Sequence, residues 1–124
     1  MNPDHSDIYK VEKRMKEAAK KLHSMSGNMG MAITIIDLDS DRRKALLARF
    51  AAPHLKAGES AAAADTLARA DDGYHVEFNR LRADYEDAQT TKHEFEVEKI
   101  SWETCRSLLA RQRETLKTLP ETEQ

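Results

Sequence analysis

Residues 67–116 read LARADDGYHVEFNRLRADYEDAQTTKHEFEVEKISWETCRSLLARQRETL, and this stretch decides the fold. Every seventh position in it is apolar, and the column consists of Leu67, Tyr74, Leu81, Ala88, Phe95, Trp102, Leu109 and Leu116. A repeat of seven places its members on one side of an α-helix, as in helices that pack along their length against a neighbour. The stretch therefore predicts a long amphipathic helix over about residues 60–117.

The triplet Asp71-Asp72-Gly73 is the weak point of this predicted helix, because Gly costs roughly 1 kcal/mol relative to Ala in a helix interior. A loop of arbitrary length would shift the heptad register, yet Tyr74 still follows Leu67 by seven residues. We therefore expect a continuous or gently kinked helix, in which Gly73→Ala stabilises the fold by roughly 0.5–1 kcal/mol. A break at Gly73 is the alternative.

The composition also favours helices. Charged residues make up 34% of the 124 residues, with only four Gly and three Pro, whereas average domains carry about 25% charged residues. Such a composition excludes most all-β and α/β enzyme folds, and the length allows one helical domain over residues 1–124. We predict an all-α, elongated helical hairpin of coiled-coil type.

Two shorter helices are expected before the long one. The first covers about residues 7–25, with a cap at Ser6 or Asp7 and a stop at Gly27-Asn28. Its apolar seam consists of Ile8, Val11, Met15, Ala18, Leu22 and Met25. The second covers about residues 40–52, with a cap at Asp39 or Ser40, and ends before Pro53. Residues 118–124 are expected to form a flexible tail.

The β-branched segment over residues 31–38 is the one strand candidate, because it contains Ile33-Thr34-Ile35-Ile36. A lone strand leaves its backbone donors and acceptors without partners. We favour a short extended connector here. The alternatives are a strand that pairs with another copy or another protein, and a helix.

Catalytic and metal-binding patterns are incomplete in this chain. Asp37 and Asp39 follow the apolar segment in an arrangement that resembles the DxDx[TV] motif of haloacid-dehalogenase-type phosphotransferases, where the first carboxylate is the nucleophile. Asp41 departs from that motif, and we interpret the three carboxylates as turn and cap residues. His93-Glu94 lacks the second histidine of an HExxH zinc site. We therefore predict no enzymatic activity, no metal, no cofactor and no small-molecule substrate.

The lower part of the long helix is apolar on two sides. Phe95, Trp102, Cys105, Leu109 and Leu116 share one side, whereas Val97, Ile100 and Leu108 lie roughly opposite. A helix that is apolar on two sides needs two neighbours. The partner-binding residues that we predict are therefore Val97, Lys99, Ile100, Trp102, Arg106 and Leu108. Alternatively, the short helix with Leu46 and Phe50 covers this side.

A basic column runs beside the apolar one and consists of Lys92, Lys99, Arg106 and Arg113. It either follows phosphates, as in helical DNA-binding regions, or pairs with the many glutamates nearby. The formal net charge of −2 disfavours a dedicated nucleic-acid binder.

These features together predict a non-enzymatic protein–protein interaction module. We expect a homodimeric accessory, assembly or inhibitor protein that acts on a larger protein machine. The alternative is a nucleic-acid-binding helical dimer that uses the basic N-terminal helix and the basic column. No apolar run reaches the roughly 20 residues of a membrane span, and the N-terminus lacks the pattern of a secretory signal, so we expect no membrane partner and a cytoplasmic location.

Overall fold

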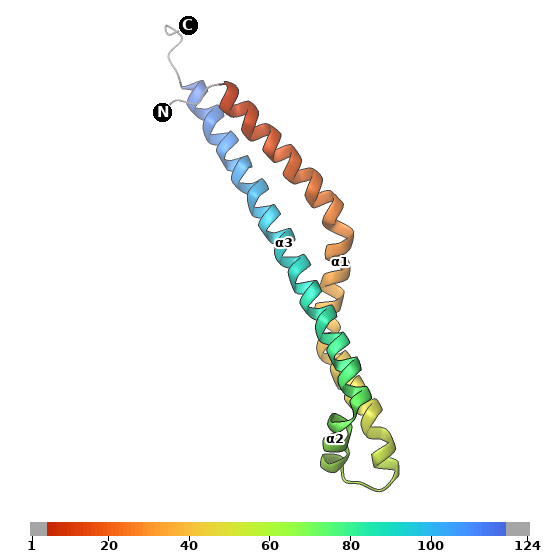
Figure 1. Cartoon of the computed structure of the whole chain (residues 1–124). Helices are drawn as coiled ribbons and strands as arrows, with labels where there is room; N and C mark the ends of the chain where they lie inside the picture. Colours follow the sequence, from red (N-terminus) through yellow and green to blue (C-terminus); the bar gives the residue numbers. More distant parts are fainter. Residues whose placement is uncertain (1–4, 119–124) are drawn as a thin grey trace. The chain divides into compact units, whose positions relative to one another are not determined.

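A computed structural model describes the backbone of residues 5–118 and the side chains of residues 7–118. It contains three helices, α1 (His5–Lys56), α2 (Ala61–Ala70) and α3 (Asp72–Lys117). The two long helices α1 and α3 pack antiparallel as a hairpin (Figure 1). The prediction of an all-α helical hairpin is therefore confirmed. The tail was predicted over residues 118–124, and its part beyond Thr118 lies outside the described residues.

The packing of the chain divides it into two compact units, each of which holds a segment of α1 and a segment of α3. The terminal unit comprises Met1–Gly27 and His93–Gln124, and the loop unit comprises Asn28–Lys92 and includes α2. The two units are described separately below.

Two heptad columns on α1 face α3, and together they form the seam of α1. One column is Ile8, Met15, Leu22, Met29, Ile36, Arg43 and Phe50, and the other is Val11, Ala18, Met25, Ala32, Asp39 and Leu46. Every member is buried or half-buried. The spacing of three and four residues is that of coiled-coil core positions.

The continuity of α1 corrects the prediction of an extended connector over residues 31–38, because this segment is helical throughout. The helices predicted over 7–25 and 40–52 are parts of the same helix. β-Branched residues lower helix propensity by less than about 0.7 kcal/mol each, and packing of Met29, Ala32 and Ile36 in the seam outweighs this preference. As part of a helix, residues 31–38 also form their backbone hydrogen bonds within α1 and need no partner strand.

The predicted ends of these two helices are also wrong. Because α1 begins at His5 and continues through Gly27 and Asn28, the expected cap at Ser6 or Asp7 and the expected stop both lie inside it. Asp39 and Ser40 lie in the helix interior and do not act as caps. Pro53 lies in the last turn of α1 and does not end it.

The true end of α1 is a Schellman motif at Gly58. The Glu59 N–H donates to the His54 carbonyl at 3.1 Å, and the Gly58 N–H donates to the Leu55 carbonyl at 3.0 Å. Gly58 has a φ of 93°, a left-handed conformation that only Gly adopts without strain. The chain then turns into α2, whose N-cap Ser60 accepts a hydrogen bond from the Ala63 N–H at 3.2 Å.

The long helix predicted over 60–117 is broken at Asp71, which ends α2 and caps α3. Asp71 is extended, with a ψ of 131°, and its N–H donates to the Ala68 carbonyl. Its carboxylate accepts a hydrogen bond from the Gly73 N–H at 2.7 Å. A capping aspartate satisfies free N–H groups of a helix start and contributes about 1 kcal/mol. This cap explains why the chain breaks here although the heptad spacing is preserved.

The core of the loop unit lies where α2 docks on the end of α1. Ala64 and Ala68 of α2 are fully buried against Ala51 of α1, and Leu47 and Phe50 pack around them. Small side chains let the two helix backbones approach closely, which explains the alanine-rich sequence of α2. In Figure 1, α2 lies beside the C-terminal end of α1.

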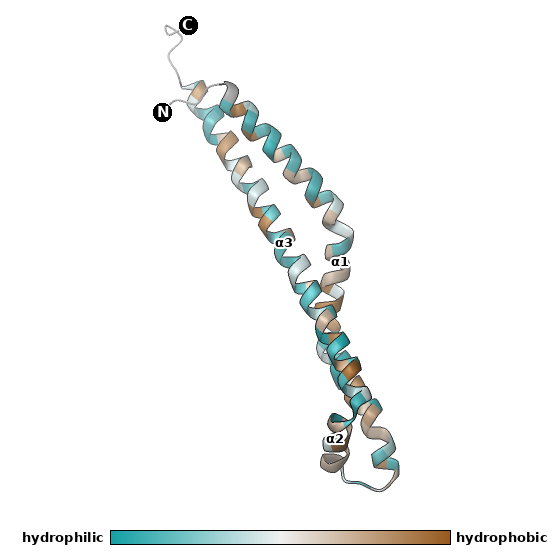
Figure 2. Ribbon diagram, viewed as in Figure 1, coloured by the Kyte–Doolittle hydropathy of each residue, from teal (hydrophilic) through white to brown (hydrophobic). Residues whose placement is uncertain are grey.

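The heptad column of α3 forms its side of the hairpin. From Tyr74 to Leu116, all seven members of the column are buried or half-buried, whereas Leu67 is on α2 and is 43% exposed. Apolar and polar residues alternate along both long helices (Figure 2), as expected for helices with one buried face. The prediction of a continuous apolar column is therefore confirmed for α3 and is wrong for Leu67.

Candidate functional site

The terminal unit contains the partner-binding residues predicted from sequence. Its buried core is Ala18 of α1 with Cys105 and Leu109 of α3. Val97 and Ile100 are 51% and 61% exposed, whereas Leu108 is half-buried. Since Val97 and Ile100 are exposed, the alternative in which a short helix with Leu46 and Phe50 covers them is wrong. Leu46 and Phe50 are seam residues of the loop unit.

Trp102 is half-buried on the seam side of α3, and the Arg106 guanidinium lies 5.7 Å from its ring centroid. Lys99 is exposed. Val97 shares an open hollow with Met25, together with Lys21, His93, Glu94 and Glu98. Ile100, Trp102 and Leu108 do not line this hollow, so the structure brings only part of the predicted set together.

The basic column is partly engaged by acids of the same unit. Arg113 contacts Glu12 of α1 through an ion pair at 3.0 Å, and Arg106 lies over Trp102. Lys21 of α1 likewise lies 4.0 Å from Glu98 of α3. These contacts match the interpretation in which the column pairs with acids of a neighbouring helix. Both ion pairs join α1 to α3 within this unit.

The carboxylates of the apparent phosphotransferase motif take no part in a common site. Asp37, Asp39 and Asp41 lie in the interior of α1, and Asp39 pairs with Arg43. In the described part of the chain, no three His, Cys, Asp or Glu side chains are grouped to hold a metal ion. None of the helices in that part has a stretch that is both long and apolar enough to cross a bilayer.

A polar layer interrupts the seam of the loop unit. Arg43 Nε lies 2.9 Å from Asp39 Oδ2, one helical turn away, and the contact is ionic because the N–H is poorly aligned for a hydrogen bond. The Arg43 guanidinium lies 5.0 Å from the Phe78 ring centroid and 5.8 Å from that of Tyr85. A cation over aromatic faces gains about 0.5–2 kcal/mol, so these rings compensate Arg43 for its partial burial.

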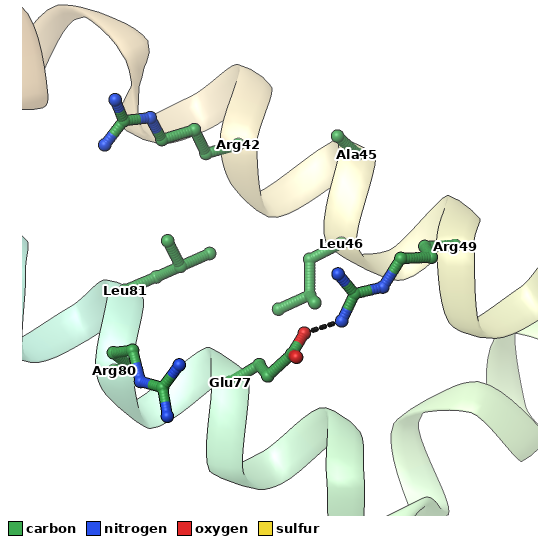
Figure 3. Close-up of a pocket in the computed structure, with 7 residues that line it drawn as sticks. All are labelled: Arg42, Ala45, Leu46, Arg49, Glu77, Arg80 and Leu81. Carbon is green, nitrogen blue, oxygen red and sulfur yellow. Dashed lines mark ion pairs between the residues drawn. The ribbon is translucent and has the colours of Figure 1, made fainter.

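A groove runs along one flank of the loop unit between α1 and α3. Its larger hollow, of about 410 Å³, is lined by Arg42, Ala45, Leu46, Arg49, Glu77, Arg80 and Leu81. Leu46 and Leu81 point into the hollow, the Arg49 and Glu77 side chains form an ion pair across it, and Arg42 and Arg80 lie at its edge (Figure 3). The hollow therefore has an apolar floor and a charged rim.

A second hollow, of about 250 Å³, lies on the same flank of the loop unit. Its lining is Asn28, Met31, Ala32, Ile35, Asp84, Asp87, Ala88 and Thr91. On each helix, the rim residues of both hollows come one position before the residues that face the other helix, so they lie along one side. Leu38 lies on the same side of α1, because it is seven residues from both Met31 and Ala45. We call this flank the groove face, and its rim consists of Asn28, Met31, Ile35, Leu38, Arg42, Ala45 and Arg49 of α1 with Glu77, Arg80, Asp84, Asp87 and Thr91 of α3.

Sequence reasoning missed the groove face, although a signal was present. Met31, Leu38 and Ala45 recur every seven residues, one position before the seam column of Ala32, Asp39 and Leu46. The β-branched residues between them favour an extended segment, in which a heptad has no meaning. No family model, no curated protein and no solved structure matches this chain.

Proposed function

We propose that the chain is a non-enzymatic protein–protein interaction module whose long helices bind a further helical surface. One observation carries this proposal. Beside its buried seam, α1 has a second row of apolar residues, in which Met31 is 66% exposed and Leu38 is 41% exposed. A helix with apolar rows on two sides is typical of one that packs between two neighbours, and α3 covers only the first row.

The chemistry of the groove face suits a protein surface better than a small ligand. Its hollows are open, and apolar side chains of Met31, Ile35 and Leu38 lie between charged groups of both signs. Binding sites for small molecules are usually concave pockets that enclose most of the ligand. Apolar centres with charged rims are typical of protein–protein interfaces.

The terminal unit offers a second exposed apolar patch at Val97 and Ile100 of α3. These residues lie three positions apart and therefore on one side of the helix. We propose that they contribute to partner binding together with the remaining predicted residues Lys99, Trp102, Arg106 and Leu108. An accessory, assembly or inhibitor role on a larger machine is consistent with such a binding module.

Nucleic-acid binding is the alternative function. Its support is the exposed Lys99 and the lysines of the first turns of α1, which alternate with Glu12 and Glu17 in the sequence. Phosphate binding makes affinity fall steeply with salt concentration, whereas an apolar interface with a few charge pairs at its rim depends on salt less steeply. Titration of binding against salt separates the two functions.

Site-specific photocrosslinking in living cells tests the proposal. A photoreactive amino acid is placed at Leu38 or Val97, and as matched controls at the exposed polar positions Lys44 and Glu103. We expect discrete protein adducts from positions 38 and 97 and few from positions 44 and 103. Equal labelling from all four positions, or adducts that a nuclease removes, would contradict the proposal.

A further inference from the structure

We propose that the groove face binds the groove face of a second copy of this chain, in an antiparallel arrangement with two-fold symmetry. This inference rests on the proposed function and names its partner. The observations that carry it are the distribution of charge along the groove face and the position of its apolar residues.

The two ends of the groove face carry opposite charges. Arg42 and Arg80 lie at one hollow, whereas Asp84 and Asp87 lie at the other. Within the described residues, none of these four side chains forms an ion pair, while the neighbouring Arg49 and Glu77 pair with one another. Two unpaired cations and two unpaired anions are thus separated along one face.

A second copy complements this pattern only when it is turned end for end. A two-fold axis brings the acidic end of each copy to the basic end of the other, so that Asp84 and Asp87 lie at the same end of the dimer as the partner's Arg80 and Arg42. In a parallel arrangement, like charges would meet at both ends, which costs affinity. Two-fold interfaces are self-complementary in this way, because each contact occurs twice.

The apolar residues of the groove face fit the same axis. Leu38 lies seven residues after Met31 and seven before Ala45, so it marks the centre of the row. An axis through Leu38 places it against the partner's Leu38 and places Met31 against the partner's Ala45. A large side chain thus meets a small one, as helix packing prefers. The exposed apolar centre and the charged ends therefore point to the same arrangement.

Charge reversal tests the interface in solution. In the first variant Arg42 and Arg80 are changed to Glu, and in the second Asp84 and Asp87 are changed to Lys. Sedimentation equilibrium of the full chain is expected to show a wild-type dimer at micromolar concentration and a rise in the dissociation constant of about 100-fold for either variant. Circular dichroism checks that each variant keeps its helix content, and Ile33→Glu, on the opposite flank of α1, is a control that keeps the dimer.

Mixing the two variants provides the decisive arm of the experiment. In an equimolar mixture, each reversed end meets a complementary end, so we expect heterodimers at near wild-type affinity. A monomeric wild type at about 100 µM, or a dimer that neither reversal weakens, would overturn the inference. Failure of the mixture to restore association would overturn it too. If the wild type is monomeric while position 38 crosslinks to a different protein in cells, this inference fails and the proposed function stands.

Discussion

Gly73 lies in the first turn of α3, where its N–H completes the cap that Asp71 forms. The residue is helical with an ordinary φ, and its N–H is held by the Asp71 carboxylate. A Cβ at this position would lie 3.0 Å from Asp71 Oδ1 and 3.2 Å from Phe50 Cε1. These distances favour a destabilising effect of Ala over the stabilising one expected from the sequence, because the methyl group would crowd both the cap and the aromatic ring.

We predict that Gly73→Ala lowers the free energy of unfolding by about 1 kcal/mol, through a weakened cap and an overpacked Phe50. Urea denaturation followed by circular dichroism measures the change. An increase in stability would show that Asp71 and Phe50 yield to the methyl group without cost.

Asp39 and Arg43 are the polar residues of the seam, and each depends on the other. Their side chains are 16% and 32% exposed. We predict that Arg43→Ala destabilises the fold by about 1–3 kcal/mol, because it removes the cation from two rings and leaves a partly buried carboxylate without its partner. Replacement of both residues by Leu should recover most of the loss, as is common for buried ion pairs. Thermal unfolding of the two variants tests this, and equal losses would contradict it.

At the scale of the helix, α1 shows why the extended segment was predicted wrongly. The seam continues past Met25 through Met29, Ala32 and Ile36, but Asp39 and Arg43 then occupy core positions. A search for apolar residues stops at these two charges and at the glycines before them. Asp39 and Arg43 pair across one turn of α1, and the aromatic rings near Arg43 belong to α3. The spacing of residues in the sequence alone does not reveal these contacts.

The two glycines inside α1 provide a test of its continuity. Gly27 and Gly30 are helical, and a Cβ at either position would meet nothing within 4 Å. We predict that Gly27→Ala and Gly30→Ala each stabilise the fold by about 0.5–1 kcal/mol, because Ala restricts the unfolded chain.

Gly58→Ala is the matched control for this pair, since Gly58 has a φ of 93° and Ala is strained there. Chemical denaturation should therefore give opposite signs for the interior glycines and for Gly58. Loss of stability in Gly27→Ala would argue for a chain break between the predicted helices and against a continuous α1.

At the scale of the whole chain, the heptad column was enough to predict an all-α hairpin. It did not predict the break at Asp71, because a capping aspartate and an interior aspartate are alike in sequence. The sequence contains a signal only for the α1 side of the groove face, since the α3 side depends on which residues of α3 lie beside Met31 and Arg42 of α1. That register follows from side-chain packing in the loop unit.

Helical periodicity likewise predicts the exposure of some of the expected partner-binding residues and not of others. Val97 and Ile100 were placed outside the seam by helical periodicity, and both are exposed. Leu108 was assigned to the same side, yet it is half-buried. Periodicity fixes an angle around the helix axis, whereas burial also depends on how closely the neighbouring helix approaches at that level.

The groove face is, in our proposal, the surface on which two copies of the chain meet. Because the two-fold axis passes through Leu38, a cysteine at this position should lie beside its own counterpart and form a disulfide between chains. The measurement is the fraction of covalent dimer formed by Leu38→Cys under mild oxidation, in a Cys105→Ala background, with Ile33→Cys as the control on the opposite flank. We predict nearly complete dimer for Leu38→Cys and little for Ile33→Cys. Equal yields from the two positions, or no dimer from Leu38→Cys, would contradict the claim.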